Sequence, residues 1–151
     1  MNKNKHWMIV LAMVMAVVGT AFVRQVVQAK SGSGEGVLTA EGNGIIGVRG
    51  NGGISVTGNG VLWIVGHEGD AEIEVSGEGR KQELANGRTR YVGFEGEALV
   101  SGSRVSVALS GYDITLEASG VGRFWLRGEG SFSTGVIEGE WRDSFESYRF
   151  E

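Results

Sequence analysis

The hydrophobic residues of this chain recur in two columns that are set by evenly spaced glycines. Gly34, Gly42, Gly50 and Gly58 lie eight residues apart, and each opens a Gly-x-Gly triplet. The five-residue segments between the triplets are typical of short strands bounded by turns. Apolar residues stand four and six positions after each leading glycine: Leu38, Ile46, Ile54 and Leu62, then Ala40, Val48, Val56 and Ile64.

This fixed offset distinguishes two ways of joining short strands. In an antiparallel meander with two-residue hairpin loops, the apolar column would move to the other face at every turn. In a solenoid, whose sides follow one another around a coil, each side points the same positions inward. Because the columns keep their offset, the sequence favours an all-β solenoid wound in a common direction. An antiparallel β-sandwich or barrel is the alternative.

The same pattern continues downstream with interruptions. Gly69 is followed at the same offsets by Ile73 and Val75, and Gly93, Gly102, Gly111 and Gly120 then step by nine residues. If three sides close one coil, the chain forms three to four coils at a strand spacing of about 4.8 Å. The further residues predicted to point inward are Ala98, Val100, Val105, Val107, Leu109, Ile114, Leu116, Ala118, Phe124, Leu126 and Phe132.

The stretch between Gly79 and Gly93 departs from the repeat. It reads as a hairpin on a type I′ Asn86-Gly87 turn, which would place Glu83 opposite Arg90 and project from the stack.

The amino-terminal segment has the features of an export signal. Lys3 and Lys5 precede an apolar run over residues 7–23, predicted to be a helix, and Val27-Gln28-Ala29 provides a small-residue cleavage site. The run is near the lower limit for a membrane span, so an uncleaved anchor is the alternative to a signal peptide. We therefore expect residues 1–29 to be a signal peptide or anchor, 30–35 a linker and 36–151 a single β domain. The protein is expected at the cell surface or envelope, or outside the cell, touching membrane only through this segment.

Composition narrows the candidate functions. The chain has no cysteine, so it has no disulfide and no thiolate site. Residues 30–151 carry 11 basic and 18 acidic side chains, a charge of −7, which lacks the basic footprint of a nucleic-acid-binding protein.

Candidate catalytic and metal-binding residues are few. His67 is the sole histidine after the apolar segment, and Ser/His/Asp catalysis would need Asp70 or Asp113 to converge on it with a serine. No nucleophile-elbow motif is present, and the sequence predicts a protein that is not an enzyme. It also predicts no cofactor. Calcium is a weaker candidate ligand, because Glu68, Asp70, Glu72 and Glu74 cluster in sequence, although Glu72 and Glu74 alternate with apolar residues as the outer face of a strand does.

Aromatic residues provide the remaining signal. Trp63, Tyr112 and Trp125 fall at outward or corner positions and could stack on sugar rings or on a partner protein. Trp63 could instead pack beneath the hairpin. From Glu138 the glycine repeat ends, and this segment is the natural cap for the last coil through Trp141, Phe145, Tyr148 and Phe150.

The segment Leu109-Ser110-Gly111-Tyr112-Asp113-Ile114-Thr115-Leu116-Glu117-Ala118-Ser119-Gly120 resembles the Ser-Gly-Asp-Ile repeats of bacterial putative adhesin head domains of the GIN type. The likeness covers roughly residues 93–128, and Tyr112 stands where that family has its second glycine. The chain also resembles uncharacterised exported bacterial proteins with the same Gly-Asn-Gly block. The resemblance implies a right-handed β-helix and an export signal, and it carries no catalytic residues.

These observations favour a non-catalytic, exported surface or envelope module that acts by adhesion or self-association. A carbohydrate-binding module or small carbohydrate-active protein is the alternative, resting on Trp63, Tyr112 and Trp125. A membrane-anchored envelope sensor or scaffold is a third hypothesis, and it requires the anchor to stay uncleaved.

Overall fold

The computed structural model describes residues 36–151, and this part of the chain is all-β apart from one 3₁₀ turn. Its elements are β1 (Gly36–Gly66), β2 (Glu72–Leu84), the turn η1 (Ala85–Gly87), β3 (Arg88–Ser133), β4 (Glu138–Glu140) and β5 (Glu146–Phe150). The predicted signal peptide or anchor, its apolar helix over 7–23 and the linker lie outside the described residues. Within residues 36–151, no helix is long and apolar enough to cross a membrane.

The glycine triplets are bends within continuous strands, so the prediction of short strands bounded by turns is wrong. β1 runs for 31 residues and β3 for 46, so the strand structure continues through each triplet while the chain bends there from one segment to the next. At Gly52 the backbone has a φ of 133°, and a Cβ there would overlap the carbonyl oxygen of Ser119 on the neighbouring strand. Glycine is needed at this bend because adjacent strands approach too closely for a side chain.

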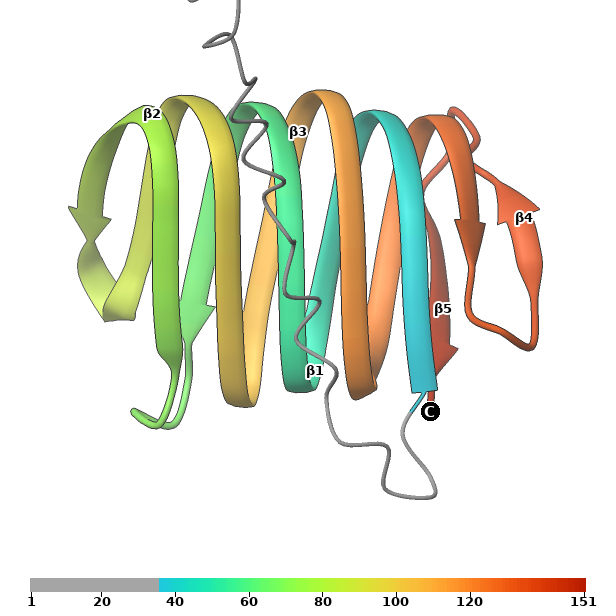
Figure 1. Ribbon diagram of the computed structural model, residues 1–151, viewed down its shortest axis with the longest axis horizontal. Helices are drawn as coiled ribbons and strands as arrows, with labels where there is room; N and C mark the ends of the chain where they lie inside the picture. The colour runs from blue at the N-terminus through green and yellow to red at the C-terminus, as the bar shows by residue number, and fades with distance from the viewer. Residues whose placement is uncertain (1–35) are drawn as a thin grey trace, which may run out of the picture.

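All the strand pairs are antiparallel, in the order β1-β3-β2, with β4 and β5 also paired to β3. The predicted common direction of neighbouring segments is therefore wrong. The chain runs out along β1 and β2, reverses at η1 and returns along β3, whose ribbon alternates with that of β1 along the long axis (Figure 1).

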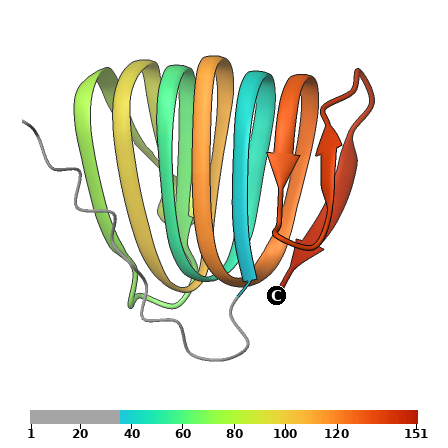
Figure 2. The same cartoon turned by 45° about the vertical axis from the view of Figure 1, so that its right-hand side comes forward.

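The register shows how β1 and β3 interleave. Leu109 of β3 pairs with Ile46 on one side and with Leu62, sixteen residues later in β1, on the other. Ala118 lies in the same way between Leu38 and Ile54. One repeat of this pairing therefore takes two eight-residue segments, not three, and the ribbons arch over from one segment to the next (Figure 2).

The predicted inward columns are confirmed as the core. All eight column residues of β1 are between 0% and 6% exposed, as are the inward residues predicted in β3. The exceptions are in β2, which is the end strand and has no described strand beyond it: Ile73 is 46% exposed and Val75 is half-buried.

Two bends of β3 absorb the extra residue of its nine-residue steps. An odd step would turn the next inward residue outward, but Arg104 and Asp113 take positive φ values of 53° and 52° at these bends. The backbone N–H of Arg104 donates to Asn51 Oδ1, and that of Asp113 donates to Asn43 Oδ1, each at 2.8 Å. The asparagines of the Gly-Asn-Gly triplets thus stabilise the strained bends of the neighbouring strand.

The predicted hairpin is present, with a register one residue away from the expectation. Asn86 and Gly87 both have positive φ, but three residues separate the last pair, Leu84 and Arg88. Arg90 is therefore opposite Gln82, to which its Nε donates at 2.8 Å, and Glu83 is opposite Thr89. The predicted projection from the stack is wrong, because residues 88–92 pair with β1 and residues 80–84 continue the same sheet as its end strand.

The other end of the sheet carries β4, β5 and most of the terminal aromatic residues. Trp141 and Phe150 are each 4% exposed, and the Tyr148 ring stacks on Phe124 with centroids 5.3 Å apart. A hydrogen bond to Glu146 raises the pKa of Tyr148. Phe145 is 57% exposed and lies away from this cluster, beneath the guanidinium of Arg127.

Candidate functional site: an arginine and tryptophan face

The strands expose two outward surfaces, which we define by their alternating positions. The Arg face consists of the outward residues of segments 45–49, 61–65, 80–84, 88–92, 106–110, 123–127 and 147–149. The Glu face consists of the outward residues of segments 37–41, 53–57, 72–76, 97–101, 115–119, 131–133 and 138–140. The buried columns alternate with these outward positions along the same segments and form one hydrophobic core.

Basic side chains gather on the Arg face. It carries seven arginines, and none of its outward positions in the described chain is acidic. The seven are Arg49, Arg80, Arg88, Arg90, Arg123, Arg127 and Arg149. Arg90 is half-buried and the other six are exposed. The nearby Glu83 is at an inward position beyond the end of the core and forms an ion pair with Lys81 at 2.9 Å.

Three of these arginines stand side by side. Arg123 of β3 is directly opposite Arg49 of β1 on one side and Arg149 of β5 on the other. Like charges in directly opposite positions destabilise a sheet. The row therefore provides a concentrated positive charge that no acidic group of this face neutralises.

Two tryptophans lie in the next row of the same face. Trp125, Gly47, Ala108, Trp63 and Arg90 are successive cross-strand neighbours. The Trp125 indole lies over Gly47, where a Cβ would overlap the ring. Arg90 lies over Trp63, with its guanidinium carbon 5.1 Å from the ring centroid. Gly47, which the Trp125 ring covers, and Ala108 therefore separate the positions of two half-buried indoles.

The structure thus brings Trp63 and Trp125 onto one face but leaves Tyr112 elsewhere. Tyr112 is 70% exposed at a bend beside Asn59, outside both faces. Trp63 is half-buried under the arginine of the hairpin strand, so both the open and the packed interpretations hold in part. The net charge does not predict the arginines of this face, because it does not say where the charges lie. The available signal is a pair of arginines at outward positions of one segment, as at Arg88 and Arg90 or at Arg123 and Arg127.

The Glu face has the opposite character. None of its described outward positions holds a basic residue. Seven hold exposed glutamates: Glu41, Glu72, Glu74, Glu97, Glu117, Glu138 and Glu140. None is directly opposite another; Glu117, for example, lies between Thr39 and Ser55. An open cleft of about 630 Å³ lies between β4 and the adjoining strands, lined by four of these glutamates and by serine and threonine hydroxyls.

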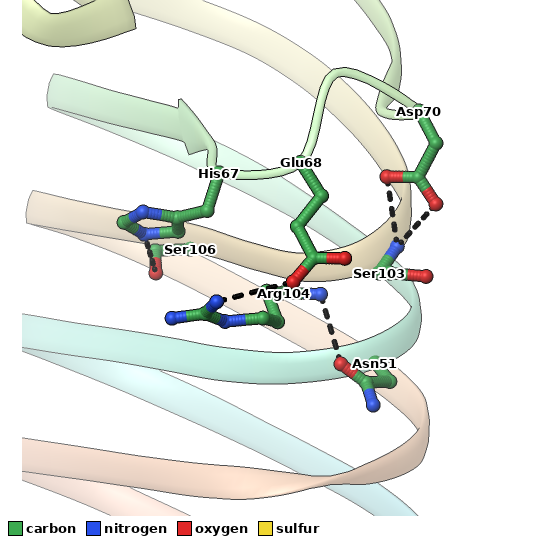
Figure 3. Close-up of polar contacts among 7 residues, drawn as sticks. All are labelled: Asn51, His67, Glu68, Asp70, Ser103, Arg104 and Ser106. Atoms are coloured by element: carbon green, nitrogen blue, oxygen red, sulfur yellow. Dashed lines mark hydrogen bonds and ion pairs between the residues drawn. The ribbon is translucent and has the colours of Figure 1, made fainter.

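The loop that joins β1 to β2 forms a polar cluster at a bend between the two faces (Figure 3). Arg104 Nη1 donates to Glu68 Oε1 at 3.1 Å, and the backbone N–H of Ser103 donates to Asp70 Oδ2 at 3.1 Å. Hydrogen bonding to Ser103, through its side chain and its backbone, lowers the pKa of the Asp70 carboxyl. These contacts fasten the loop to the bend of β3.

The candidate catalytic residues do not form a triad in the described structure. His67 Nε2 lies 3.3 Å from Ser106 Oγ, but the Asp70 carboxylate faces the Ser103 backbone (Figure 3). Asp113 lies at the bend that Asn43 stabilises, whereas the loop of His67 contacts the bend that Asn51 stabilises. Among residues 36–151, no group of three or more His, Asp or Glu side chains is placed to hold a metal ion; of the calcium candidates, Glu68 and Asp70 have the loop partners named above, and Glu72 and Glu74 point outward on the Glu face.

Comparisons with protein-family models, with curated proteins and with solved structures find no match for this chain.

Proposed function

We propose that this protein is an exported, non-catalytic β-solenoid that acts as an adhesion module of the cell surface or envelope, and that its Arg face binds an acidic polysaccharide. The observation that carries the proposal is the segregation of seven arginines and two tryptophans, with no acidic residue, onto one outward face of the described chain.

The solenoid is the finer interpretation of the pairing register. It is supported by β3 residues such as Leu109 that lie between two β1 residues sixteen positions apart. A sheet that returns to its neighbour at this interval winds around its own core. The resemblance of residues 93–128 to adhesin head domains supports the right-handed form and the surface role.

The chemistry of the Arg face suits a charged sugar polymer. Guanidinium groups bind carboxylate, phosphate and sulfate oxygens in bidentate fashion, and indole rings stack on apolar ring faces. The backbones of Trp125 and Trp63 are three strand spacings apart, about 14 Å, with Gly47 and Ala108 between them. An extended polymer that lies across the strands would meet both rings and the arginine row together.

The proposal is tested by titrating the full chain with polygalacturonate, with uncharged dextran and with duplex DNA at low salt. The triple variant Arg49→Gln/Arg123→Gln/Arg127→Gln should bind polygalacturonate at least tenfold more weakly. The matched control, Glu41→Gln/Glu97→Gln/Glu117→Gln, changes three exposed residues of the other face and should bind as tightly as the unmodified chain. Binding of dextran should be undetectable.

Substitutions of the two tryptophans test whether the Arg face binds a polysaccharide rather than another polyanion. Trp63→Ala and Trp125→Ala should each weaken polygalacturonate binding severalfold while weakening duplex DNA less, because a base-paired duplex presents no free ring face. Polygalacturonate binding that survives the arginine triple variant would refute the proposal. Tighter binding of DNA than of the polysaccharide would indicate that the Arg face binds nucleic acid instead.

A further inference from the structure

We infer that the Glu face is a docking surface for the Arg face of a second copy of this chain, so that copies stack face to face. The inference deepens the self-association side of the surface role and rests on the same Arg face as the proposed function. It also assigns a partner to the Glu face, which polysaccharide binding leaves unused.

Charge complementarity within one molecule carries the argument. The two faces lie on either side of a single core, one with seven arginines and no acid at its described outward positions, the other with seven glutamates and no base. Potentials of opposite sign steer encounter and fix the register of an interface. Two Arg faces, or two Glu faces, would repel each other, so a symmetric pairing of like faces is disfavoured.

The two faces also match in size and spacing. Seven strand segments cross each face, and six spacings of about 4.8 Å by five residues of about 3.3 Å give a surface of about 29 by 16 Å. That area is below the roughly 800 Å² per partner of a standard interface. A single contact should therefore be weak and sensitive to salt.

The cleft on the Glu face provides a seat for arginine side chains. Glu41, Glu117, Glu138 and Glu140 line it beside serine and threonine hydroxyls. On the Arg face the row of Arg49, Arg123 and Arg149 lacks an acidic neighbour among the described residues. Charge-assisted hydrogen bonds between the two sets would relieve the repulsion within the arginine row.

The ends of the sheet are less suited to association than the faces. The outer edge of β2 carries charged residues along its whole length, and β4 and β5 at the other end have only three and five residues. Charged and short edge strands resist pairing with another chain. A contact between an Arg face and a Glu face leaves one face free on each copy, so it does not close and generates a linear stack.

The decisive experiment mixes two variants of the full chain that each keep one face. The Arg-neutral variant, Arg49→Gln/Arg123→Gln/Arg127→Gln, keeps the Glu face, and the Glu-neutral variant, Glu41→Gln/Glu97→Gln/Glu117→Gln, keeps the Arg face. By sedimentation velocity at low salt, the unmodified chain should form a concentration-dependent series of assemblies. Each variant alone should be monomeric, and the mixture should stop at a one-to-one dimer, because neither partner retains a second docking surface.

The outcomes separate this inference from the proposed function. Raising the salt to about 0.5 M, where the Debye length falls to a few ångströms, should disperse the assemblies. A Glu-neutral variant that assembles as the unmodified chain does, or a mixture that remains monomeric, would overturn the inference even if polygalacturonate binding is intact. Loss of assembly with unchanged polysaccharide binding in the Arg-neutral variant would support the inference and refute the proposed function.

Discussion

The Arg face and the Glu face are built on the same ladders, yet they distribute their charges in opposite ways. On the Glu face the glutamates are opposite serine, threonine or leucine, as Glu117 is between Thr39 and Ser55. On the Arg face, Arg49, Arg123 and Arg149 are direct neighbours. Dispersed charges cost the isolated fold little, whereas a row of like charges lowers its stability. The Arg face is therefore the surface that gains more from a partner.

The largest difference between the faces should come from a glycine on each. At Gly47 an added methyl group would overlap the Trp125 ring, whereas at Gly53 on the Glu face it would meet only Ser119 Oγ at 3.6 Å. Gly47→Ala should lower the free energy of unfolding by about 1–3 kcal/mol, and Gly53→Ala should change it by less than about 0.5 kcal/mol.

Urea unfolding of both variants measures this contrast. Gly47→Ala should also weaken polygalacturonate binding, because the displaced indole no longer lies flat on the sheet. Equal stability of the two variants would show that Trp125 does not rest on Gly47 in solution.

A smaller difference should follow from removing one central charge from each face. Arg123→Gln separates Arg49 from Arg149 and should stabilise the fold by about 0.2–1 kcal/mol at low salt. Glu117→Gln removes a charge with neutral neighbours and should have little effect. The gain for Arg123→Gln should shrink in thermal unfolding as salt is added, and a loss of stability at low salt would contradict the repulsive row.

The smallest effect concerns the loop at the bend between the faces. Hydrogen bonding to Ser103 lowers the pKa of Asp70 below its usual 3.8, so the contact stabilises the fold above pH 3.8 and is lost as pH falls through the lowered pKa. The amide chemical shift of Ser103 should therefore titrate with a midpoint below 3.8, and Asp70→Asn should abolish this transition. A midpoint at or above 3.8 would show that the hydrogen bond is absent.

The inward columns could be predicted from the sequence because an even spacing of glycines leaves the same positions pointing inward in every segment. Ile46, Ile54 and Leu62 are buried for this reason. Strand direction could not be predicted in the same way. The spacing states which side of a strand is buried, but it does not state whether Ile46 pairs with a residue of the next segment or, as found, with Leu109 of the returning strand.

The Arg face could not be found from local patterns because its residues come from segments far apart in the chain. Arg49, Arg88 and Arg123 meet on one surface because β3 returns between successive segments of β1. The charge of −7 over residues 30–151 is dominated by acids elsewhere. The outward placement of Trp63 and Trp125 could be predicted more easily, because each residue is at an outward position of its own segment.

The interleaving of β1 with β3 has a consequence for how the molecule acquires its shape. Each segment of β1 has segments of β3 as its strand partners, so the first half of the described chain has no sheet to join until the second half has been synthesised. Closing the loop at Ala85–Gly87 costs least, and each later pairing must bridge a longer stretch of chain. Assembly is therefore expected to zip outward from that reversal point, with the amino-terminal and carboxyl-terminal strands joining last.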